Sequence, residues 1–219
     1  EVVIAMEDPN PQVSGKGIKE LREAGISVIS GIMKEEAEKL NEFYLKYITL
    51  KKPFVILKVA MTLDGKIATP EGESKWITGE KARQAVHKLR DSVDAVMTAI
   101  GTVKADDPEL TVRLSGAGSR KQGTDKPVRI VIDPDLEVPL DARVLKTPPE
   151  TIIPTIRPEG RRQKAFEDKK RHLLGIGVQL IEYEGEEIDL SRLMSRLGEL
   201  GIASILTEGG SSLNAHALE

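Results

Sequence analysis

The sequence contains no cysteine and only 3 histidines among its 219 residues. Without cysteine, the chain can form no disulfides, iron–sulfur clusters or thiolate zinc sites. The histidines, His87, His172 and His216, are far apart and do not follow the spacing of metal ligands. We therefore expect no metal site within these residues.

Aromatic residues make up only 3% of the chain, and the formal net charge is -3. Few aromatic residues argue against a stacking platform for single-stranded nucleic acid, and the charge gives no reason to expect nucleic acid or an anionic membrane as a partner. No apolar run approaches the roughly 20 residues that span a bilayer, and no signal peptide is recognisable. We therefore expect a cytoplasmic protein with no nucleic-acid or membrane partner.

Short apolar runs alternate with amphipathic stretches along the chain. Strands are expected at 2–6, 26–29, 54–61, 94–100, 128–132, 178–181 and 202–207, and helices at 17–24, 34–50, 79–90, 161–174 and 190–200. This alternation is typical of an α/β architecture with a largely parallel sheet. Residues 115–126 are polar and contain glycine, so we expect a mobile surface loop there.

The run Lys51-Lys52-Pro53 marks a boundary between two parts of the chain. Residues 1–50 have the order strand–helix–strand–helix, which predicts a parallel pair of strands joined by a right-handed crossover. So short a segment is typical of the end of a domain, whereas residues 51–219 are long enough for a domain of their own. Within the first part, the cluster Asp8-Pro9-Asn10-Pro11 is either a structural turn or part of a pocket lining.

The segment Glu208–Ala215 is the first of three candidate functional segments. A strand is expected to run into Gly209 and Gly210, and a serine-rich helix start follows. Glycines let a ligand approach the backbone closely, and helix N–H groups favour phosphate, so the segment could cradle a pyrophosphate. The alternative is an ordinary strand–turn–helix corner with a serine cap. The segment lacks the GxGxxG fingerprint of a standard dinucleotide site.

The second candidate segment surrounds the end of the strand at 54–61. Its Asp64-Gly65 turn places the last side chains of the strand at the sheet edge, where α/β proteins bind ligands. Lys58, in an apolar strand, must extend its ammonium to solvent, pair with a carboxylate or meet a substrate anion. Trp76, the only tryptophan, either covers a cofactor ring or anchors the core, and the core is the more common role.

The third candidate segment, Gly101–Arg113, follows the strand at 94–100. Its adjacent carboxylates could bind ribose hydroxyls, supply a proton or cap a helix. For Asp107, which precedes a proline, a capping or turn role is favoured. Arg113 could hold a phosphate through two hydrogen bonds, or it could simply be a solvated surface residue.

Six stretches occur in one order along the chain: AMEDPNPQVSGKG, LKVAMTLDGKIAT, GESKWIT, GTVKADDPELTVR, PVRIVID and ILTEGGSSLNA. Together they resemble the bifunctional riboflavin-biosynthesis deaminase/reductase family. The resemblance implies a dihydrofolate-reductase-like reductase domain at 51–219, preceded by the C-terminal part of a cytidine-deaminase-like domain at 1–50. It also implies NADPH as the cofactor, 5-amino-6-(5-phosphoribosylamino)uracil as the substrate, reduction of the ribosyl group to a ribityl chain, and a homodimer.

The resemblance also assigns roles to individual residues. Positions that bind the cofactor in the family match Ala60, Trp76, Thr102, Asp106, Gly210, Ser211, Ser212, Leu213, Asn214, Ala215 and His216. Positions that contact the substrate match Ser74, Arg90, Leu110, Arg113 and Glu208, and Lys58 matches a strand lysine expected near the sugar. We expect Arg90 and Arg113 to hold the phosphate or the ring oxygens, and Lys58 or Asp106 to polarise or protonate the opening sugar.

Three departures from the family pattern limit these assignments. The family's zinc motifs, a His-x-Glu and a cysteine pair, do not occur, so zinc and deamination are expected only if another segment of the intact protein supplies them. Pro134 replaces the usual serine or threonine beside the cofactor, and the chain stops at Glu219 where the family continues, so we expect a fragment. A generic dihydrofolate-reductase-like enzyme and a non-catalytic nucleotide-binding fragment are the alternatives.

Overall fold

The computed structural model describes residues 1–74, 76–113, 127–146, 148 and 150–218, so the loop expected at 115–126 lies outside the described residues. The chain forms two compact units. The first comprises Glu1–Phe54 with Ser195–Ala203, and the second comprises Val55–Met194 with Ser204–Glu219. The assignment of residues 1–50 to a deaminase-like domain and of 51–219 to a reductase domain stays a prediction.

The first unit contains a 2-stranded sheet of β1 (Val2–Ile4) and β2 (Val28–Ser30). The strands are parallel and are joined through helix α1 (Lys16–Glu23), which confirms the expected parallel pair. The Asp8–Pro11 cluster forms a turn in which the Asn10 N–H donates to Asp8 Oδ1 at 2.9 Å. The cluster therefore forms a turn, and its Pro9 also lines a cavity of the first unit, so both interpretations of the cluster hold.

The single helix expected at 34–50 was wrong, because the structure has two helices there. Helix α2 (Lys34–Leu40) and helix α3 (Glu42–Leu50) are separated by Asn41, whose backbone angles are φ -111° and ψ 19°. The Asn41 amide Nδ2 donates to the carbonyl oxygen of Ala37 at 2.8 Å. A short amide side chain that binds a nearby carbonyl offers the backbone an alternative to the helical ladder, and the helix ends there.

The second unit is built on a 6-stranded sheet with the strand order β3-β8-β4-β5-β6-β7. The strands are β3 (Phe54–Lys58), β4 (Ala95–Ala99), β5 (Val128–Ile132), β6 (Thr151–Ile156), β7 (Gln179–Tyr183) and β8 (Ser204–Glu208). The pairings of β4 with β5 and β8, of β5 with β6, and of β6 with β7 are parallel. Val96, Ile130, Ile153 and Leu206 are fully buried in this sheet, as expected for strands covered on both faces. The expected α/β class is confirmed.

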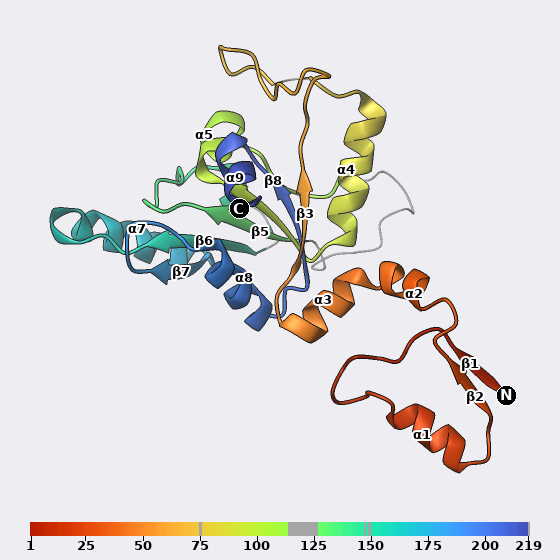
Figure 1. Ribbon diagram of the computed structural model, residues 1–219. Coiled ribbons are helices and arrows are strands. Elements are labelled where there is room, and N and C mark those ends of the chain that lie inside the picture. Colours follow the sequence, from red (N-terminus) through yellow and green to blue (C-terminus); the bar gives the residue numbers. More distant parts are fainter. Residues whose placement is uncertain (75, 114–126, 147, 149, 219) are drawn as a thin grey trace. The chain divides into compact units, whose positions relative to one another are not determined.

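Helices lie between successive strands of this sheet along the chain, and one more follows the last strand (Figure 1). They are α4 (Glu80–Ser92), α5 (Ile100–Asp106), α6 (Arg143–Lys146), α7 (Gln163–Gly175), α8 (Leu190–Glu199) and α9 (Ser211–His216), with a 3-10 turn at Gly160–Arg162. Helix α5 follows β4 directly, and α9 follows β8 after Gly209 and Gly210. Both short helices therefore begin at the carboxyl ends of their strands and frame that edge of the sheet (Figure 1).

Strand β6 and helices α5 and α6 were not expected from the sequence. Strand β6 has Pro154 at an interior position, where a proline normally argues against a strand because it lacks an N–H donor. Here the Pro154 carbonyl still accepts a hydrogen bond from the Asp133 N–H at 3.0 Å, and Pro154 pairs in register with Ile181 of β7. The strand therefore tolerates one missing donor while keeping its other pairings.

Candidate functional site: a cleft at the carboxyl edge of the sheet

A cleft of about 1020 Å³ opens at the carboxyl ends of the sheet strands in the second unit. The last residues of β3, β8, β4 and β5, which are Lys58, Glu208, Ala99 and Ile132, all line it. This edge is where open α/β sheets bind their ligands. Small-molecule pockets usually measure roughly 300–1,000 Å³, so this cleft lies at the upper end of that range.

Most of the residues singled out by the family resemblance come together in this cleft. Its lining includes Lys58, Ala60, Ser74, Trp76, Arg90, Thr102, Asp106, Leu110, Arg113, Glu208, Gly210, Ser212, Leu213, Asn214 and His216. Within the described part of the chain, Ala215 does not line the cleft, and the Ser211 side chain lies outside what the structure describes. The individual binding roles of these residues stay predictions.

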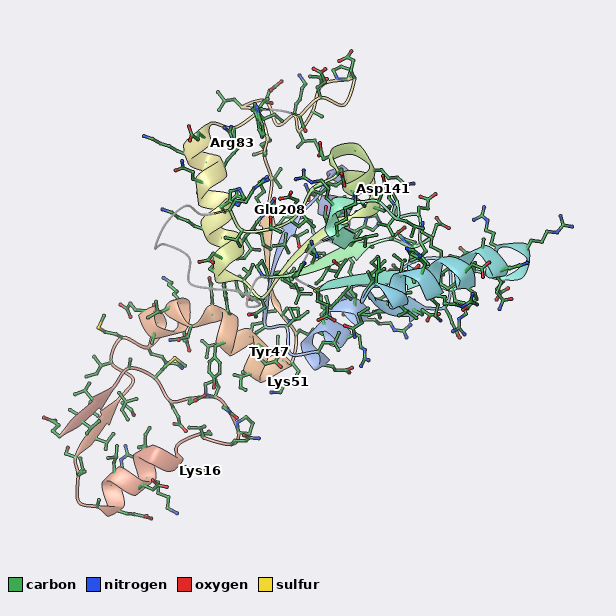
Figure 2. All side chains as sticks on the ribbon, turned by 180° about the vertical axis from the view of Figure 1, so that it is seen from behind. Lys16, Tyr47, Lys51, Arg83, Asp141 and Glu208 are labelled. Carbon is green, nitrogen blue, oxygen red and sulfur yellow. The ribbon has the colours of Figure 1, made fainter. Side chains whose placement is uncertain are left out.

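Glu208 is the centre of a partly buried ion-pair cluster, and Figure 2 labels it within the second unit. Arg90, on α4, donates from Nε to Glu208 Oε1 at 2.6 Å and from Nη2 to Glu208 Oε2 at 3.0 Å. Both side chains are only 12% exposed. Lys58 Nζ lies 3.9 Å from Glu208 Oε2, which is too far for a good hydrogen bond. Glu208 thus makes a close ion pair with Arg90 and only a distant one with Lys58. The Lys58 ammonium therefore has N–H donors left that could bind a ligand in the cleft.

Arg90 was expected to hold substrate phosphate, but much of its donor capacity goes to protein groups. In addition to the two bonds with Glu208, its Nη1 donates to the Thr111 carbonyl at 2.9 Å. Arg113, in contrast, has a side chain that is 63% exposed and lies 3.5 Å from Glu109. Of these two arginines, Arg113 is therefore the one with more freedom to meet an incoming anion.

The segment from Asp107 to Arg113 forms one wall of the cleft through an unusual backbone path. Asp107 and Leu110 have positive φ angles of 41° and 52°, which are disfavoured for residues with a Cβ. Asp107 ends helix α5, which bears out its expected turn role, and Leu110 is only 3% exposed. Arg143 supports the segment by donating its backbone N–H to Asp107 Oδ1 at 2.8 Å and by pairing its guanidinium with Glu109.

His87, on α4, contacts the same segment. Its Nδ1 accepts a hydrogen bond from the backbone N–H of Arg113 at 3.2 Å, which requires the neutral ring. Burial lowers the pKa of His87 below the ordinary value of 6.5, and the nearby charges of Arg90 and Arg113 lower it further. The environment of the imidazole therefore favours the form that can make this hydrogen bond.

The two glycines between β8 and α9 differ in their surroundings. A Cβ on Gly209 would lie 3.0 Å from the Leu213 side chain, so the local packing favours glycine there. A Cβ on Gly210 would meet no atom of the described residues within 4 Å, and its φ of -75° suits any residue. The space beside Gly210 is cleft, which fits a position where a ligand comes close to the backbone.

Two buried polar atoms lie close in sequence to these glycines. Thr207 is fully buried and Asn214 is 9% exposed. Within the described ranges, neither Thr207 Oγ1 nor Asn214 Oδ1 has a hydrogen-bond partner. Buried polar groups are nearly always paired, so the unpaired oxygen of Asn214, which lines the cleft, is compatible with a polar ligand or with bound water, whereas Thr207 is not among the described residues that line it.

The expectation that Trp76 anchors the core was wrong. Trp76 is 72% exposed, and it lines the cleft instead. The guanidinium of Arg83, labelled on α4 in Figure 2, lies 4.4 Å from the centre of its ring, within the range of a cation–π contact. Trp76 therefore offers a flat, partly covered ring at the cleft wall, as its assigned cofactor-binding role would require.

Pro134 also lines the cleft, at the position where the family usually has a hydroxyl residue. Its carbonyl oxygen accepts hydrogen bonds from the Ile156 N–H at 2.9 Å and from Thr155 Oγ1 at 3.1 Å. The carbonyl is thus already bound to the protein, and the ring presents an apolar surface. The Pro134 side chain has no hydroxyl group, so it cannot make the cofactor contact that serine or threonine would make at this position.

Sequence reasoning missed several residues of the cleft. Arg143 lines it from α6, Glu186, Glu187 and Ile188 line it from the connection between β7 and α8, and Leu190 lines it from the first position of α8. These residues belong to no motif and lie far along the chain from the predicted segments, so nothing in the sequence indicated that they would line the cleft. In the part of the chain that the structure describes, no group of three or more His, Asp or Glu residues is arranged to hold a metal ion. Among the described helices, none is both long and apolar enough to cross a membrane.

Comparison with known proteins gives a consistent set of matches. The family described as the RibD C-terminal domain matches residues 53–219. The riboflavin biosynthesis protein RibD of Actinobacillus pleuropneumoniae is 43% identical over 221 residues, covering 100% of this chain and 56% of that protein. The chain thus spans about half the length of the curated relatives it matches.

Two solved structures resemble this chain closely. Acinetobacter baumannii RibD, form 1, superposes with a TM-score of 0.82 at 37% identity, covering 99% of this chain and 56% of that one. A Thermotoga maritima protein described as a diaminohydroxyphosphoribosylaminopyrimidine deaminase/5-amino-6-(5-phosphoribosylamino)uracil reductase superposes with a TM-score of 0.79 at 38% identity, with the same coverage of 99% and 56%. The expected family fold is therefore confirmed.

Proposed function

The chain belongs to the RibD C-terminal domain family, and from that premise we propose that it reduces the ribosyl group of 5-amino-6-(5-phosphoribosylamino)uracil to the ribityl compound with NADPH. The observation that carries this proposal is the cleft at the carboxyl edge of the sheet. It brings the Gly209–Gly210 turn together with the Lys58, Glu208 and Arg90 cluster. A cofactor site and a polar substrate site would thus adjoin each other, as hydride transfer requires.

Several features of the cleft fit NADPH. The open space beside Gly210 would let a pyrophosphate approach the backbone N–H groups of the turn, and the exposed ring of Trp76 offers a flat contact surface. Asn214 brings a buried amide oxygen with no partner among the described residues, which a polar cofactor group could satisfy. When bound, NADPH would supply the hydride.

The protein's own contribution is to position the sugar and to move protons. Opening of the ribose breaks the bond between C1′ and the ring oxygen, and this oxygen takes a proton while the exocyclic nitrogen gives up its own to form a C=N bond. After reduction at C1′, the nitrogen regains a proton. Lys58 is our candidate for the acid, because its ammonium is 29% exposed and only loosely paired with Glu208 at 3.9 Å. Arg90 holds Glu208, and the exposed Arg113 is our candidate for the phosphate.

A direct assay tests this proposal. The purified chain is mixed with the phosphoribosylamino-uracil and with NADPH deuterated at the transferred position, and the product is analysed by mass spectrometry. We expect one deuterium at C1′ of a ribityl product. The absence of this product, with a folded protein and bound NADPH, would rule the proposal out in favour of a non-catalytic nucleotide-binding fragment.

A generic dihydrofolate-reductase-like enzyme is the other enzymatic candidate. Offering dihydrofolate in the same assay separates the two, because the ion-pair cluster is suited to a charged sugar phosphate. A deaminase activity would need zinc ligands from outside this sequence, since cysteine is absent from it. Homodimer formation and a cytoplasmic location stay predictions of the same family resemblance.

A further inference from the structure

Arg143 belongs to none of the sequence motifs and was given no role, yet it lines the cleft. It is the first residue of helix α6, and its side chain is 48% exposed. Its guanidinium Nη2 pairs with Glu109 Oε1, and its backbone N–H donates to Asp107 Oδ1 at 2.8 Å. Arg143 therefore holds two successive acidic residues of the 107–113 segment from outside that segment.

The 107–113 segment needs such support because its backbone is strained. Asp107 and Leu110 both adopt left-handed conformations, at φ 41° and 52°. Residues with a Cβ persist in this region only when the surrounding structure fixes them. Burial fixes Leu110, which is 3% exposed, and the backbone N–H of residue 143, whatever its side chain, fixes Asp107 through a hydrogen bond. The intervening Glu109 is held through its side chain.

Glu109 passes the support of Arg143 on to Arg113. One carboxylate oxygen, Oε1, meets Arg143, while the other, Oε2, lies 3.5 Å from Arg113 Nη1 and accepts from Thr111 Oγ1 at 3.3 Å. The Arg143 contact occupies one oxygen of the carboxylate and leaves the other to Arg113 and Thr111. Because the Arg113 side chain is 63% exposed, its position depends on this contact more than on packing.

We propose that Arg143 is a positioning residue for the sugar-phosphate substrate: acting through Glu109, it holds Arg113 in the orientation in which this residue contacts that substrate. This inference rests on the proposed function. Arg143 is expected to act on substrate binding rather than on NADPH binding, because its side chain contacts Glu109, which in turn contacts Arg113.

The test compares Arg143→Gln with a matched control, Arg157→Gln. Arg157 is similarly exposed, at 51%, and pairs with Glu182 at 3.1 Å, but it is not among the described residues that line the cleft. We expect Arg143→Gln to raise the KM for the phosphoribosylamino-uracil roughly 5- to 30-fold, the effect of about one or two kcal/mol, with the KM for NADPH unchanged. Arg157→Gln should leave both constants unchanged. An unaltered substrate KM in Arg143→Gln would overturn the inference.

A double-mutant cycle with Glu109→Gln separates positioning from direct contact. If Arg143 acts through Glu109, the variant carrying both substitutions should have a substrate affinity no lower than that of the single variant with the lower affinity. Additive effects would mean that Arg143 touches the substrate itself and would overturn the proposed route.

Hydrogen exchange gives a readout that does not depend on activity. We expect backbone amides of residues 107–113 to exchange faster in Arg143→Gln than in Arg157→Gln. Unchanged exchange would overturn the inference even if the enzyme proved inactive. If the parent protein lacked reductase activity but exchange were still faster in Arg143→Gln, the proposed function would be excluded. The conclusion that Arg143 supports the 107–113 segment would remain.

Discussion

Arg90 and Glu208 are 118 positions apart in the sequence, yet both oxygens of the Glu208 carboxylate accept hydrogen bonds from the Arg90 guanidinium, at 2.6 Å and 3.0 Å. The pair joins α4 to the end of β8 and thereby fixes one wall of the cleft. With both side chains 12% exposed, neither charge is well solvated. Such a pair is hard to break on one side only.

We expect Glu208→Gln to lower the free energy of unfolding by about 3 kcal/mol, because it leaves the Arg90 charge buried without its counter-charge. Urea unfolding measures this loss. Replacing both partners by apolar residues, Arg90→Met with Glu208→Leu, should recover most of the stability while reductase activity stays lost. A single variant as stable as the parent would contradict the buried-pair interpretation.

Part of the site could be predicted from the sequence because its candidate segments surround or follow strand ends, and the family resemblance gave roles to single residues in them. Glu208 was expected at the end of a strand and is the last residue of β8, whereas Lys58 was expected inside a strand at 54–61 and is the last residue of the shorter β3. Arg143 could not be found this way, since it meets Glu109 across 34 positions along a path that no local pattern reveals. Trp76 was misjudged because a rare aromatic is usually buried, whereas here Arg83 covers one face of an exposed ring.

The same limit applies to the fold. Amphipathic patterns placed α4, α7 and α8 within a few residues, and the apolar run of β5 was placed at its observed bounds. Strand β6 was missed because Pro154 breaks the local pattern of a strand. The missing N–H donor of Pro154 is tolerated only because β6 pairs with strands that are distant in the sequence. The break at Asn41 was missed because its amide competes locally for the Ala37 carbonyl.

We expect Gly210→Ala to weaken NADPH binding roughly tenfold or more without destabilising the fold, because an added Cβ meets no described protein atom within 4 Å but fills the space proposed for the cofactor. Titration of NADPH followed by Trp76 fluorescence measures the affinity. Gly175→Ala, at the end of α7 and equally free of contacts among the described residues, is the control and should bind NADPH like the parent. Equal affinities in the two variants would exclude Gly210 from the cofactor site.

Gly198→Ala should destabilise the first unit by about 1–3 kcal/mol or more, because an ideal Cβ would lie 2.0 Å from the Lys51 carbonyl oxygen. Backbone atoms must move to relieve this overlap. Gly17→Ala, in helix α1 of the same unit, meets no described atom within 4 Å and should be neutral or slightly stabilising. Chemical unfolding of both variants compares the two effects, and similar stabilities would show that the close approach at Gly198 is absent in solution.

His87 makes the 107–113 segment sensitive to acid. Its pKa in the folded protein lies below the ordinary 6.5 because of burial first and of Arg90 and Arg113 second, while Glu208 acts in the opposite direction. The unfolded chain therefore binds this proton more readily than the folded one. The contribution of neutral His87 to stability is complete above about 6.5 and is lost as the pH falls through the lowered pKa of the folded state.

We therefore expect the thermal unfolding temperature of the parent protein to fall more steeply than that of His87→Gln as the pH is lowered below about 6.5. The glutamine cannot titrate, and its amide oxygen can still accept from the Arg113 N–H. The KM for the sugar-phosphate substrate should rise in parallel, because protonation removes the acceptor that anchors Arg113 at 3.2 Å. Measuring both quantities across the acidic range in the two proteins tests the idea, and identical pH profiles would assign the acid sensitivity to other groups.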